Sequence, residues 1–466
     1  MSSKSERFVR GGARGLTGLA ITGAAAAGAL LLGTIQFPTV EREPHALQVN
    51  TTQSGERSIV CAGAFPELGA DPSRPDVAVP VGEASVLVSG DGELGTLGGS
   101  GEGGANATGA RVLTGASEAP LAAAQTQTLT SASLTGLTAA ACVEPVNEQW
   151  LVGGGSTLGL STTLTLGNSS EVPATAQITV FDENGEIDAV QTAGVIVAPQ
   201  SEQLVSLNGY APNRERLAVR ITSTGAPVAA ALGIARVDGI VPVGAATVTR
   251  QLRAEKLVVI PGVTNEDSHD HEEVPSDTGP ADRFPVLVNA LTPGDAAGSA
   301  QVFAVDGKGK RTELGAIDLE PRVVGSLAVE SWPHDATAVV IDADVPVFAG
   351  AAGASNSGET HDFDWFAPAP EIPEGVETPA PVVSGGALVL ANLGEDAAEV
   401  KVEGGDAKTV TVDPGAAVVV PGSGKRTITS TEPVHAGVRL LGSGRIAGYP
   451  VMPRAEHTGE LTVYTR

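Results

Sequence analysis

The residues best suited to chemistry lie in one acidic segment, residues 265–273. His269 and His271 stand two residues apart, so both imidazoles would project from the same side of an extended chain, with Asp267 and Asp270 beside them. Imidazole nitrogens and carboxylate oxygens together suit a divalent cation. The alternative is a solvated acidic loop, because runs of charge are ordinarily solvated. We treat the four residues as metal candidates, favour the loop, and predict no cofactor.

Two cysteines, Cys61 and Cys142, predict a disulfide bond. An even pair of this kind is typical of proteins exported to an oxidising compartment. The alternative, a metal-binding or nucleophilic thiol pair, lacks both a Cys-x-x-Cys spacing and a neighbouring histidine. Closing a loop of roughly 80 residues would stabilise the fold by about 4–5 kcal/mol in the chain-entropy model.

Other patterns that resemble functional motifs favour structural roles. No serine occupies a Gly-x-Ser-x-Gly motif, and none of the seven histidines stands beside a recognisable nucleophile. The alternating acidic residues 182–188 resemble a calcium loop but are better explained by a hairpin turn. Residues 90–109 indicate a glycine-rich loop, not a nucleotide site. The segment 361–366 contains a histidine and two aspartates, which could suggest a metal site, and aromatic residues, which could bind a sugar. We instead favour burial of the aromatic residues in a local core or in a contact between domains.

The first forty residues predict a membrane anchor. Four basic residues within positions 1–15 precede an uncharged run over residues 16–37. A helix of this length spans the ~30 Å hydrocarbon core of a bilayer, and the basic flank places the N-terminus in the cytoplasm. Residues 38–57 form a polar tether. A cleaved signal peptide is the alternative, but the apolar run is longer than a usual signal, so we favour a single-pass protein of the cell membrane with its C-terminal bulk outside.

The charge balance excludes nucleic acid as an expected partner. Acidic residues number 54 against 28 basic ones, which gives a net charge of −26, and aromatic residues make up 3% of the chain. Binding a polyanion needs clustered cations, and single strands also need aromatic platforms.

From residue 150 onward the sequence repeats three landmarks in one order. The first is an alternating apolar run that ends at an asparagine, followed by a second alternating run and a turn. The second is a proline before an apolar run, and the third is a Pro-Val pair that opens a strand of small residues. The three sets are Asn168, Pro199 and Pro227; Asn289, Pro321 and Pro346; and Asn392, Pro414 and Pro433.

Short strands with turns every 8 to 12 residues or so are typical of antiparallel sandwiches. The sequence therefore predicts an all-β fold of tandem immunoglobulin-like β-sandwiches after one transmembrane helix. We expect a disulfide-stapled N-terminal region with the first sandwich at residues 58–260, a second sandwich at 283–367 and a third at 382–466, joined by linkers. The antibody-type Cys and Trp hallmarks are missing, so "immunoglobulin-like" refers to architecture alone.

The stretch from Cys142 to Phe181 carries a resemblance. Its Cys-Val-Glu-Pro, Trp-Leu-Val-Gly-Gly-Gly and Thr-Leu-Thr-Leu-Gly-Asn segments resemble a family of unknown function among exported proteins of high-GC Gram-positive bacteria. The resemblance implies one N-terminal membrane segment, two cysteines and β-rich repeats, often encoded near envelope glycosyltransferases. A count of 7 lysines against 21 arginines fits a GC-rich genome.

These observations favour a non-catalytic role. We expect a membrane-anchored envelope scaffold or assembly factor near cell-wall glycan synthesis, with an envelope protein or a cell-wall glycan as partner. The alternatives are an enzyme that acts on envelope glycan and a surface module that binds a glycan or a metal.

Overall fold

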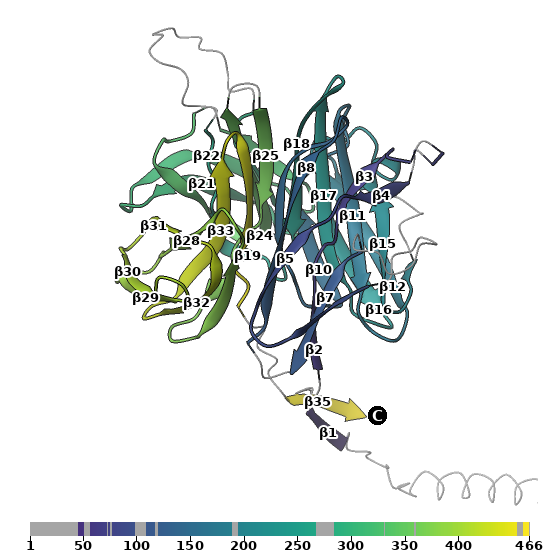
Figure 1. Cartoon of the computed structure of the whole chain (residues 1–466), viewed down its shortest axis with the longest axis horizontal. Coiled ribbons are helices and arrows are strands. Elements are labelled where there is room, and N and C mark those ends of the chain that lie inside the picture. Colours follow the sequence, from purple (N-terminus) through teal and green to yellow (C-terminus); the bar gives the residue numbers. More distant parts are fainter. Residues whose placement is uncertain are drawn as a thin grey trace, which may run out of the picture. The chain divides into compact units, whose positions relative to one another are not determined.

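The computed structural model describes residues 45–50, 56–71, 73–74, 77–97, 109–116, 120–188, 194–266, 284–329, 331–357, 360–453 and 460–465. Strands dominate these residues, and the one helical element among them is a short 3-10 turn, η2 (Leu207–Gly209) (Figure 1). The predicted all-β class is confirmed. No helix within the described ranges has the length and apolarity needed to cross a membrane. The predicted anchor at residues 16–37 lies outside these ranges.

The chain divides into two compact units, residues 1–52 with 457–466, and residues 53–456. In the first unit, β1 (His45–Asn50) pairs antiparallel with β35 (Glu460–Thr465), so segments from opposite ends of the sequence form one two-stranded ribbon. All other strands belong to the second unit, which we divide into four consecutive strand groups.

The second group shows the arrangement most completely. Its inner sheet has the order β15-β11-β17-β18, and its outer sheet has the order β10-β16-β12-β13, with β14 beside β12. Alternating residues of both sheets meet in one core that includes Leu164, Ile178, Ile221 and Leu232. The strands are β10 (Glu148–Val152), β11 (Leu160–Asn168), β12 (Ala174–Asp182), β13 (Gly185–Glu186), β14 (Val195–Val197), β15 (Ser201–Ser206), β16 (Ala218–Thr224), β17 (Ala229–Asp238) and β18 (Val241–Thr249).

The third group has the same two-sheet order but shares one long strand. The first half of β24 pairs with β19 and β21, and its second half pairs with β20 and β25. A single strand therefore runs through both sheets. The strands are β19 (Glu255–Pro261), β20 (Leu287–Leu291), β21 (Gly298–Asp306), β22 (Arg311–Leu319), β23 (Gly325–Ala328), β24 (Ala336–Ser357) and β25 (Thr360–Phe366).

The fourth group places β31-β28-β33-β34 in one sheet, with β26 also on β33, and β27-β32-β29-β30 in the other. Its core includes Leu388, Val400, Val438 and Tyr449. The strands are β26 (Glu371–Ile372), β27 (Thr378–Val382), β28 (Gly386–Ala391), β29 (Ala398–Glu403), β30 (Lys408–Val412), β31 (Ala417–Pro421), β32 (Gly424–Ser430), β33 (Val434–Gly442) and β34 (Arg445–Pro450).

The N-terminal strands form a shorter group with the same order. Strands β5-β8-β9 correspond to β11-β17-β18, and β2-β7-β6 correspond to β10-β16-β12. Pro120 lies two residues before the first residue of β8, as Pro227 lies two residues before β17, so the proline of this landmark recurs, followed by Leu121 in place of valine. The strands are β2 (Glu56–Val60), β3 (Phe65–Leu68), β4 (Ala78–Val81), β5 (Ser85–Ser89), β6 (Glu93–Thr96), β7 (Arg111–Ala116), β8 (Ala122–Thr130) and β9 (Thr135–Ala141), with β3 and β4 in a separate hairpin.

The landmark asparagines close buried turns. Asn168 Nδ2 donates to the carbonyls of Val172 and Val197, and its Oδ1 accepts from the N–H of Ser170. Asn392 Nδ2 donates to the carbonyls of Asp396 and Val412, and its Oδ1 accepts from the N–H of Gly394, which is the same pattern. Each side chain therefore replaces backbone partners that the turn leaves unpaired.

Asn289, the remaining predicted asparagine, does not occupy the equivalent position. Leu291 lies opposite Phe348, two residues after Pro346, just as Gly167 lies opposite Ala229, two residues after Pro227. The residue equivalent to Asn168 is therefore Thr292, and Asn289 lies inside β20.

The last strand of each group lies at the centre of the second unit. Strand β9 contacts β18, β18 contacts β25, β25 contacts β34, and β34 contacts β9. We call these four strands the inner ring. Glycines permit the close approach: a Cβ on Gly136 would lie 2.5 Å from the backbone nitrogen of Ala245, and one on Gly448 would lie 2.3 Å from the ring of Phe366.

The substitution Gly244→Ala tests this close approach. Its added Cβ would lie 2.5 Å from Asp362 Oδ1 and 3.0 Å from the backbone nitrogen of Phe363, so strands must shift. We expect a loss of about 1–3 kcal/mol in the free energy of unfolding, measured by urea titration. Gly209→Ala is the control, because nothing lies within 4 Å of its added Cβ. Equal midpoints for the two variants would contradict the close packing of the ring.

Candidate functional site

The predicted metal candidates His269, His271, Asp267 and Asp270 lie outside the described residues. Within the part of the chain that the structure describes, no three His, Cys, Asp or Glu side chains are grouped so that they could hold a metal ion. The remaining candidates are the cysteine pair, the acidic turn, the segment 361–366 and one surface groove.

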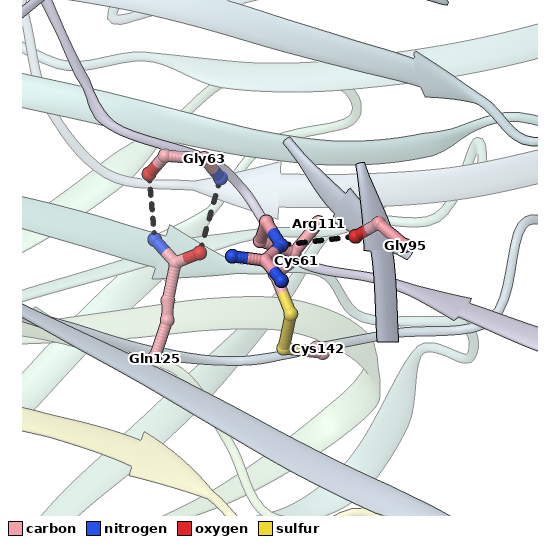
Figure 2. The surroundings of a disulfide bond; sticks show 6 residues. All are labelled: Cys61, Gly63, Gly95, Arg111, Gln125 and Cys142. Carbon is pink, nitrogen blue, oxygen red and sulfur yellow. Dashed lines mark hydrogen bonds between the residues drawn. A yellow bond between two sulfur atoms is a disulfide. The ribbon is translucent and has the colours of Figure 1, made fainter. Parts of the chain in front are cut away.

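Cys61 and Cys142 form the predicted disulfide, with an S–S distance of 2.01 Å, and both residues are buried. Cys61 follows β2 and Cys142 follows β9, so the bond joins the two main sheets of the N-terminal group. Beside it, Gln125 Oε1 accepts from the N–H of Gly63 at 3.0 Å and Gln125 Nε2 donates to the Gly63 carbonyl at 2.9 Å, as Figure 2 shows. The pair is thus a structural link inside the protein.

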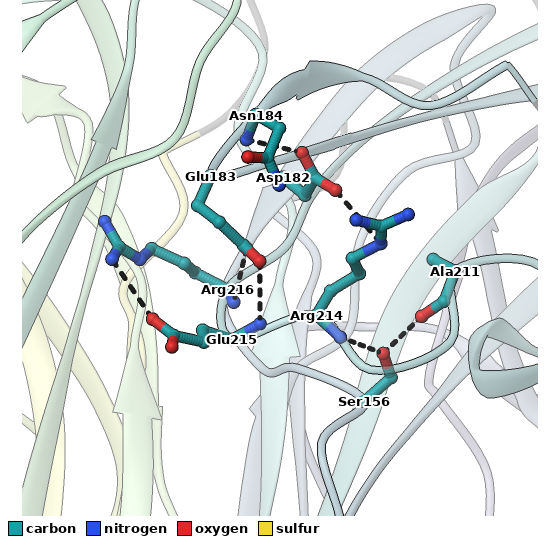
Figure 3. A network of polar contacts seen from close by, with 8 residues as sticks. All are labelled: Ser156, Asp182, Glu183, Asn184, Ala211, Arg214, Glu215 and Arg216. Carbon is teal, nitrogen blue, oxygen red and sulfur yellow. Dashed lines mark hydrogen bonds and ion pairs between the residues drawn. The ribbon is translucent and has the colours of Figure 1, made fainter.

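The acidic turn at residues 182–188 is the predicted hairpin, because β12 pairs with β13. Asp182 Oδ1 accepts from the N–H of Asn184 at 2.6 Å, and its other oxygen forms an ion pair with Arg214 at 3.1 Å. The neighbouring Glu183 carboxylate accepts from the N–H groups of Glu215 and Arg216 (Figure 3). The carboxylates of Asp182 and Glu183 therefore hold the turn to the loop that contains Arg214.

The segment 361–366 carries two buried carboxylates on the inner ring. Asp362 and Asp364 are two residues apart on β25 and share a face, and both are almost fully inaccessible. The aromatic residues between and after them are buried as predicted: Phe363 and Trp365 lie in the core of the second group, and Phe366 lies in the core of the third.

Asp362 connects all four strands of the inner ring. Its Oδ2 accepts hydrogen bonds from the N–H of Leu137 on β9, at 2.8 Å, and of Ile446 on β34, at 3.4 Å. Its Oδ1 accepts from the N–H of Phe363 at 3.0 Å and lies against Gly244 of β18. The carboxylate of Asp362 therefore accepts hydrogen bonds from N–H groups of the inner ring that have no partner in a neighbouring strand.

Asp364 adds a second link of the same kind. Its Oδ2 accepts a hydrogen bond from the N–H of Gly448 on β34 at 2.6 Å. Burial raises its pKa well above the ordinary range, and the nearby carboxylate of Asp362 raises it further.

Burial raises the pKa of Asp362 to about 8, although the N–H groups of Leu137, Ile446 and Phe363 and the charge of Arg445 act in the opposite direction. Both carboxylate oxygens of Asp362 and Oδ2 of Asp364 accept hydrogen bonds from backbone N–H groups, whereas a cation site needs oxygen or nitrogen acceptors. The pair therefore serves the fold, and its protonation links stability to pH.

The surface groove lies on the outer sheet of the second group, against segments of the third. Its volume is about 530 Å³, within the range of ligand sites. The groove is lined by Glu148, Trp150, Gln177, Thr179, Phe181, Glu186, Arg220, Leu252, Ala254, Pro293, Arg322 and Phe348.

Strand register arranges the groove side chains in rows. Trp150, Arg220 and Thr179 are cross-strand neighbours on β10, β16 and β12. Glu148 and Gln177 both lie opposite Thr222, in the adjacent row. Residues at alternate positions project from the same face, so hydrogen-bonding side chains repeat across the groove.

Three stacked and buried aromatic rings lie at the base of the groove. Trp150 stacks on Phe348 with ring centroids 4.6 Å apart and on Phe181 with centroids 5.4 Å apart. Arg220 lies 5.7 Å from the Trp150 ring and forms an ion pair with Glu148 at 2.9 Å. These contacts hold the side chains in one arrangement.

The turn network of Figure 3 supports one wall of the groove. The carbonyl of Asp182 accepts from the N–H of Val324, and Arg216 Nη1 donates to the Val324 carbonyl at 3.4 Å. Glu186 follows this turn, and Arg322 precedes Val324 by two residues, so these contacts hold the backbone close to both groove residues.

The carboxylates of the groove lie too far apart for glycoside hydrolysis. Glu148 and Glu186 are separated by three strand spacings and by four residues along the strands, which places their Cα atoms roughly 20 Å apart. Retaining enzymes need carboxyl groups about 5 Å apart, and inverting enzymes need them within about 10 Å. These two residues therefore do not form a glycosidase pair.

A comparison with protein families assigns the chain to one family. The model of a family of unknown function (DUF5719) matches residues 102–423, more than half of the chain, and the chain belongs to that family. The resemblance seen in the sequence is thereby confirmed at the level of the family. A search of curated proteins finds no significant match.

Proposed function

We propose that this member of a family of unknown function is a membrane-anchored envelope protein that acts without catalysis, as a scaffold or assembly factor near cell-wall glycan synthesis. The basic-flanked apolar run at residues 16–37 supports the anchor, and the buried Cys61–Cys142 bond supports export to an oxidising compartment.

One observation carries the non-catalytic role. Reactive side chains within the described residues hold strands together: Asp362 and Asp364 bind backbone N–H groups of other strand groups, and the cysteines are bonded to each other. Four strand groups locked at one centre provide a rigid body on which partners can be held in fixed positions.

The anchor can be tested by fractionation and protease protection. We expect the full chain to remain in the membrane fraction after alkaline carbonate washing and to retain Met1. Protease added to cells stripped of their outer wall layers should remove an epitope at residue 466 and spare one fused before residue 1. Recovery of a soluble form in the culture fluid that begins near residue 30 would contradict the anchor and favour the cleaved signal.

The scaffold role can be tested by crosslinking in cells. We expect the tagged full chain to crosslink to a defined membrane protein, which mass spectrometry would identify after detergent extraction. The matched control is a tagged chain that retains residues 1–57 but lacks the rest, and it should lose the crosslink. If the full chain crosslinks only to the proteins that the control also recovers, the scaffold proposal fails.

A surface module that binds glycan is the second candidate function. The specific observation in its favour is the groove beside Trp150, which has the volume of a ligand site and side chains that both donate and accept hydrogen bonds.

A further inference from the structure

We propose that the groove formed by β10, β16, β12 and β13 against the third strand group binds an uncharged oligosaccharide. The inference rests on the proposed location at the envelope, where such chains are present, and it adds a ligand class to that proposal. The argument uses the groove's charge, its polar pattern and its apolar lining.

The charge of the groove favours a neutral ligand. Two cations, Arg220 and Arg322, stand beside two anions, Glu148 and Glu186. Arg220 pairs with Glu148, and Arg322 pairs with Asp295 outside the groove. The cations are therefore compensated, while the chain as a whole carries −26 and repels anionic polymers.

The polar pattern favours a ligand rich in hydroxyl groups. Gln177 presents both a donor and an acceptor, Thr179 presents a hydroxyl, and the carboxylate of Glu148 accepts. Their positions follow the strand spacing of about 4.8 Å in one direction and about 6.6 Å in the other. Hydroxyl groups on consecutive sugar rings can be met by such a two-dimensional array, whereas a peptide strand would need a free backbone edge.

The lining also offers apolar surface for the C–H faces of sugar rings. Leu252 is 43% exposed and lies with Pro293 in the wall. Trp150 is fixed between Phe181 and Phe348, so the lining loses little freedom when a ligand binds. The groove therefore has both polar and apolar surface, as a sugar ring does.

The experiment is a binding titration of the purified full chain in detergent. The probes are linear tetrasaccharides of glucose, mannose, galactose, arabinose and N-acetylglucosamine, with tetragalacturonate as the anionic comparator. We expect at least one neutral tetrasaccharide to bind, with an affinity that stays constant between low and high salt because no counterions are released.

Variants locate the binding. Gln177→Ala together with Thr179→Ala should weaken binding roughly tenfold, since each lost hydrogen bond contributes about 0.5–1.5 kcal/mol. Thr175→Ala is the matched control: it lies on the same face of β12 one position beyond the groove lining and should bind as the parent does. Equal melting temperatures for all three proteins would exclude misfolding.

Three outcomes overturn the inference: binding to none of the neutral probes, binding to tetragalacturonate alone with steep salt dependence, or equal losses in the groove and control variants. The result of the binding titration does not depend on the proposed function, because it is measured on purified protein and not in the cell. Failure of the fractionation test with intact binding would leave a glycan-binding protein of another location.

Discussion

The protein should be more stable at pH 5 than at pH 8, because Asp362 is buried on the inner ring. Its pKa is raised to about 8 in the folded protein, against about 3.9 in an unfolded chain. Between these values the folded state binds a proton that the unfolded state has lost, so the free energy of unfolding falls as pH rises. For this group alone the fall approaches about 1.4 kcal/mol per pH unit, and Asp364 acts in the same direction.

Asp362→Asn isolates this effect, since the amide has nearly the same shape and does not titrate. Urea titrations at pH 5, 6, 7 and 8 should show the parent losing roughly 3 kcal/mol of stability relative to the variant across the series. Asp406→Asn, at an exposed position, is the control and should keep the parent's pH dependence. If the Asp362→Asn variant kept the parent's slope, Asp362 would already be ionised in the folded protein.

Asp362→Ala should cost more than the charge-neutral change at every pH. It removes the acceptor for the N–H groups of Leu137 and Ile446 in a region without solvent access. Each buried donor left without a partner costs about 1–3 kcal/mol, and the missing carboxylate leaves a cavity. A loss no greater than that of Asp362→Asn at pH 8 would show that solvent reaches the inner ring.

Loss of the disulfide should produce the second large effect. The bond between Cys61 and Cys142 closes a loop with a sequence separation of 81, and replacing both cysteines by alanine should lower the free energy of unfolding by roughly 2–5 kcal/mol. The bond joins two sheets of the N-terminal group, so amide exchange should accelerate most in β2 and β9. Differential scanning calorimetry and hydrogen exchange measure the two effects.

Thiol labelling of the parent checks that the bond is internal. Because both cysteines are almost fully buried, a reductant should release thiols only when urea is also present. The double variant must remain folded for this comparison, and its strand content is checked by circular dichroism. If the variant unfolds at the parent's midpoint with uniform exchange, the bond does not stabilise the N-terminal group.

Local features of the sequence were predictable because neighbouring residues determine them. Pro227 and Pro433 lie just before β17 and β33, as predicted, because proline and the residue before it favour extended conformations. Pro346 was wrongly predicted to open a strand, since it lies inside β24. The Asn289 landmark was placed in the wrong register, because an alternating run fits equally well when it is moved along the strand and only the pairing with β24 decides.

The site at the inner ring could not be predicted from the sequence, because it depends on contacts between residues that are far apart in the chain. The sequence showed Asp362 and Asp364 as acidic residues among aromatic ones, but their partners Leu137, Ile446 and Gly448 come from strands far away in the chain. The groove is likewise assembled from β10, β12, β16 and residues after 250. The repeat was not recognised in the N-terminal group because Gly90 replaces the landmark asparagine there.

The inner ring also determines the order in which the chain can finish folding. Synthesis proceeds from the N-terminus, so β9, β18 and β25 are made before β34. Until residues 445–450 arrive, Asp362 and Asp364 lack the N–H donors of Ile446 and Gly448 and one side of the ring faces water. The addition of β34 therefore completes the inner ring. The carboxylates of Asp362 and Asp364 lose contact with solvent only when this last strand has been made.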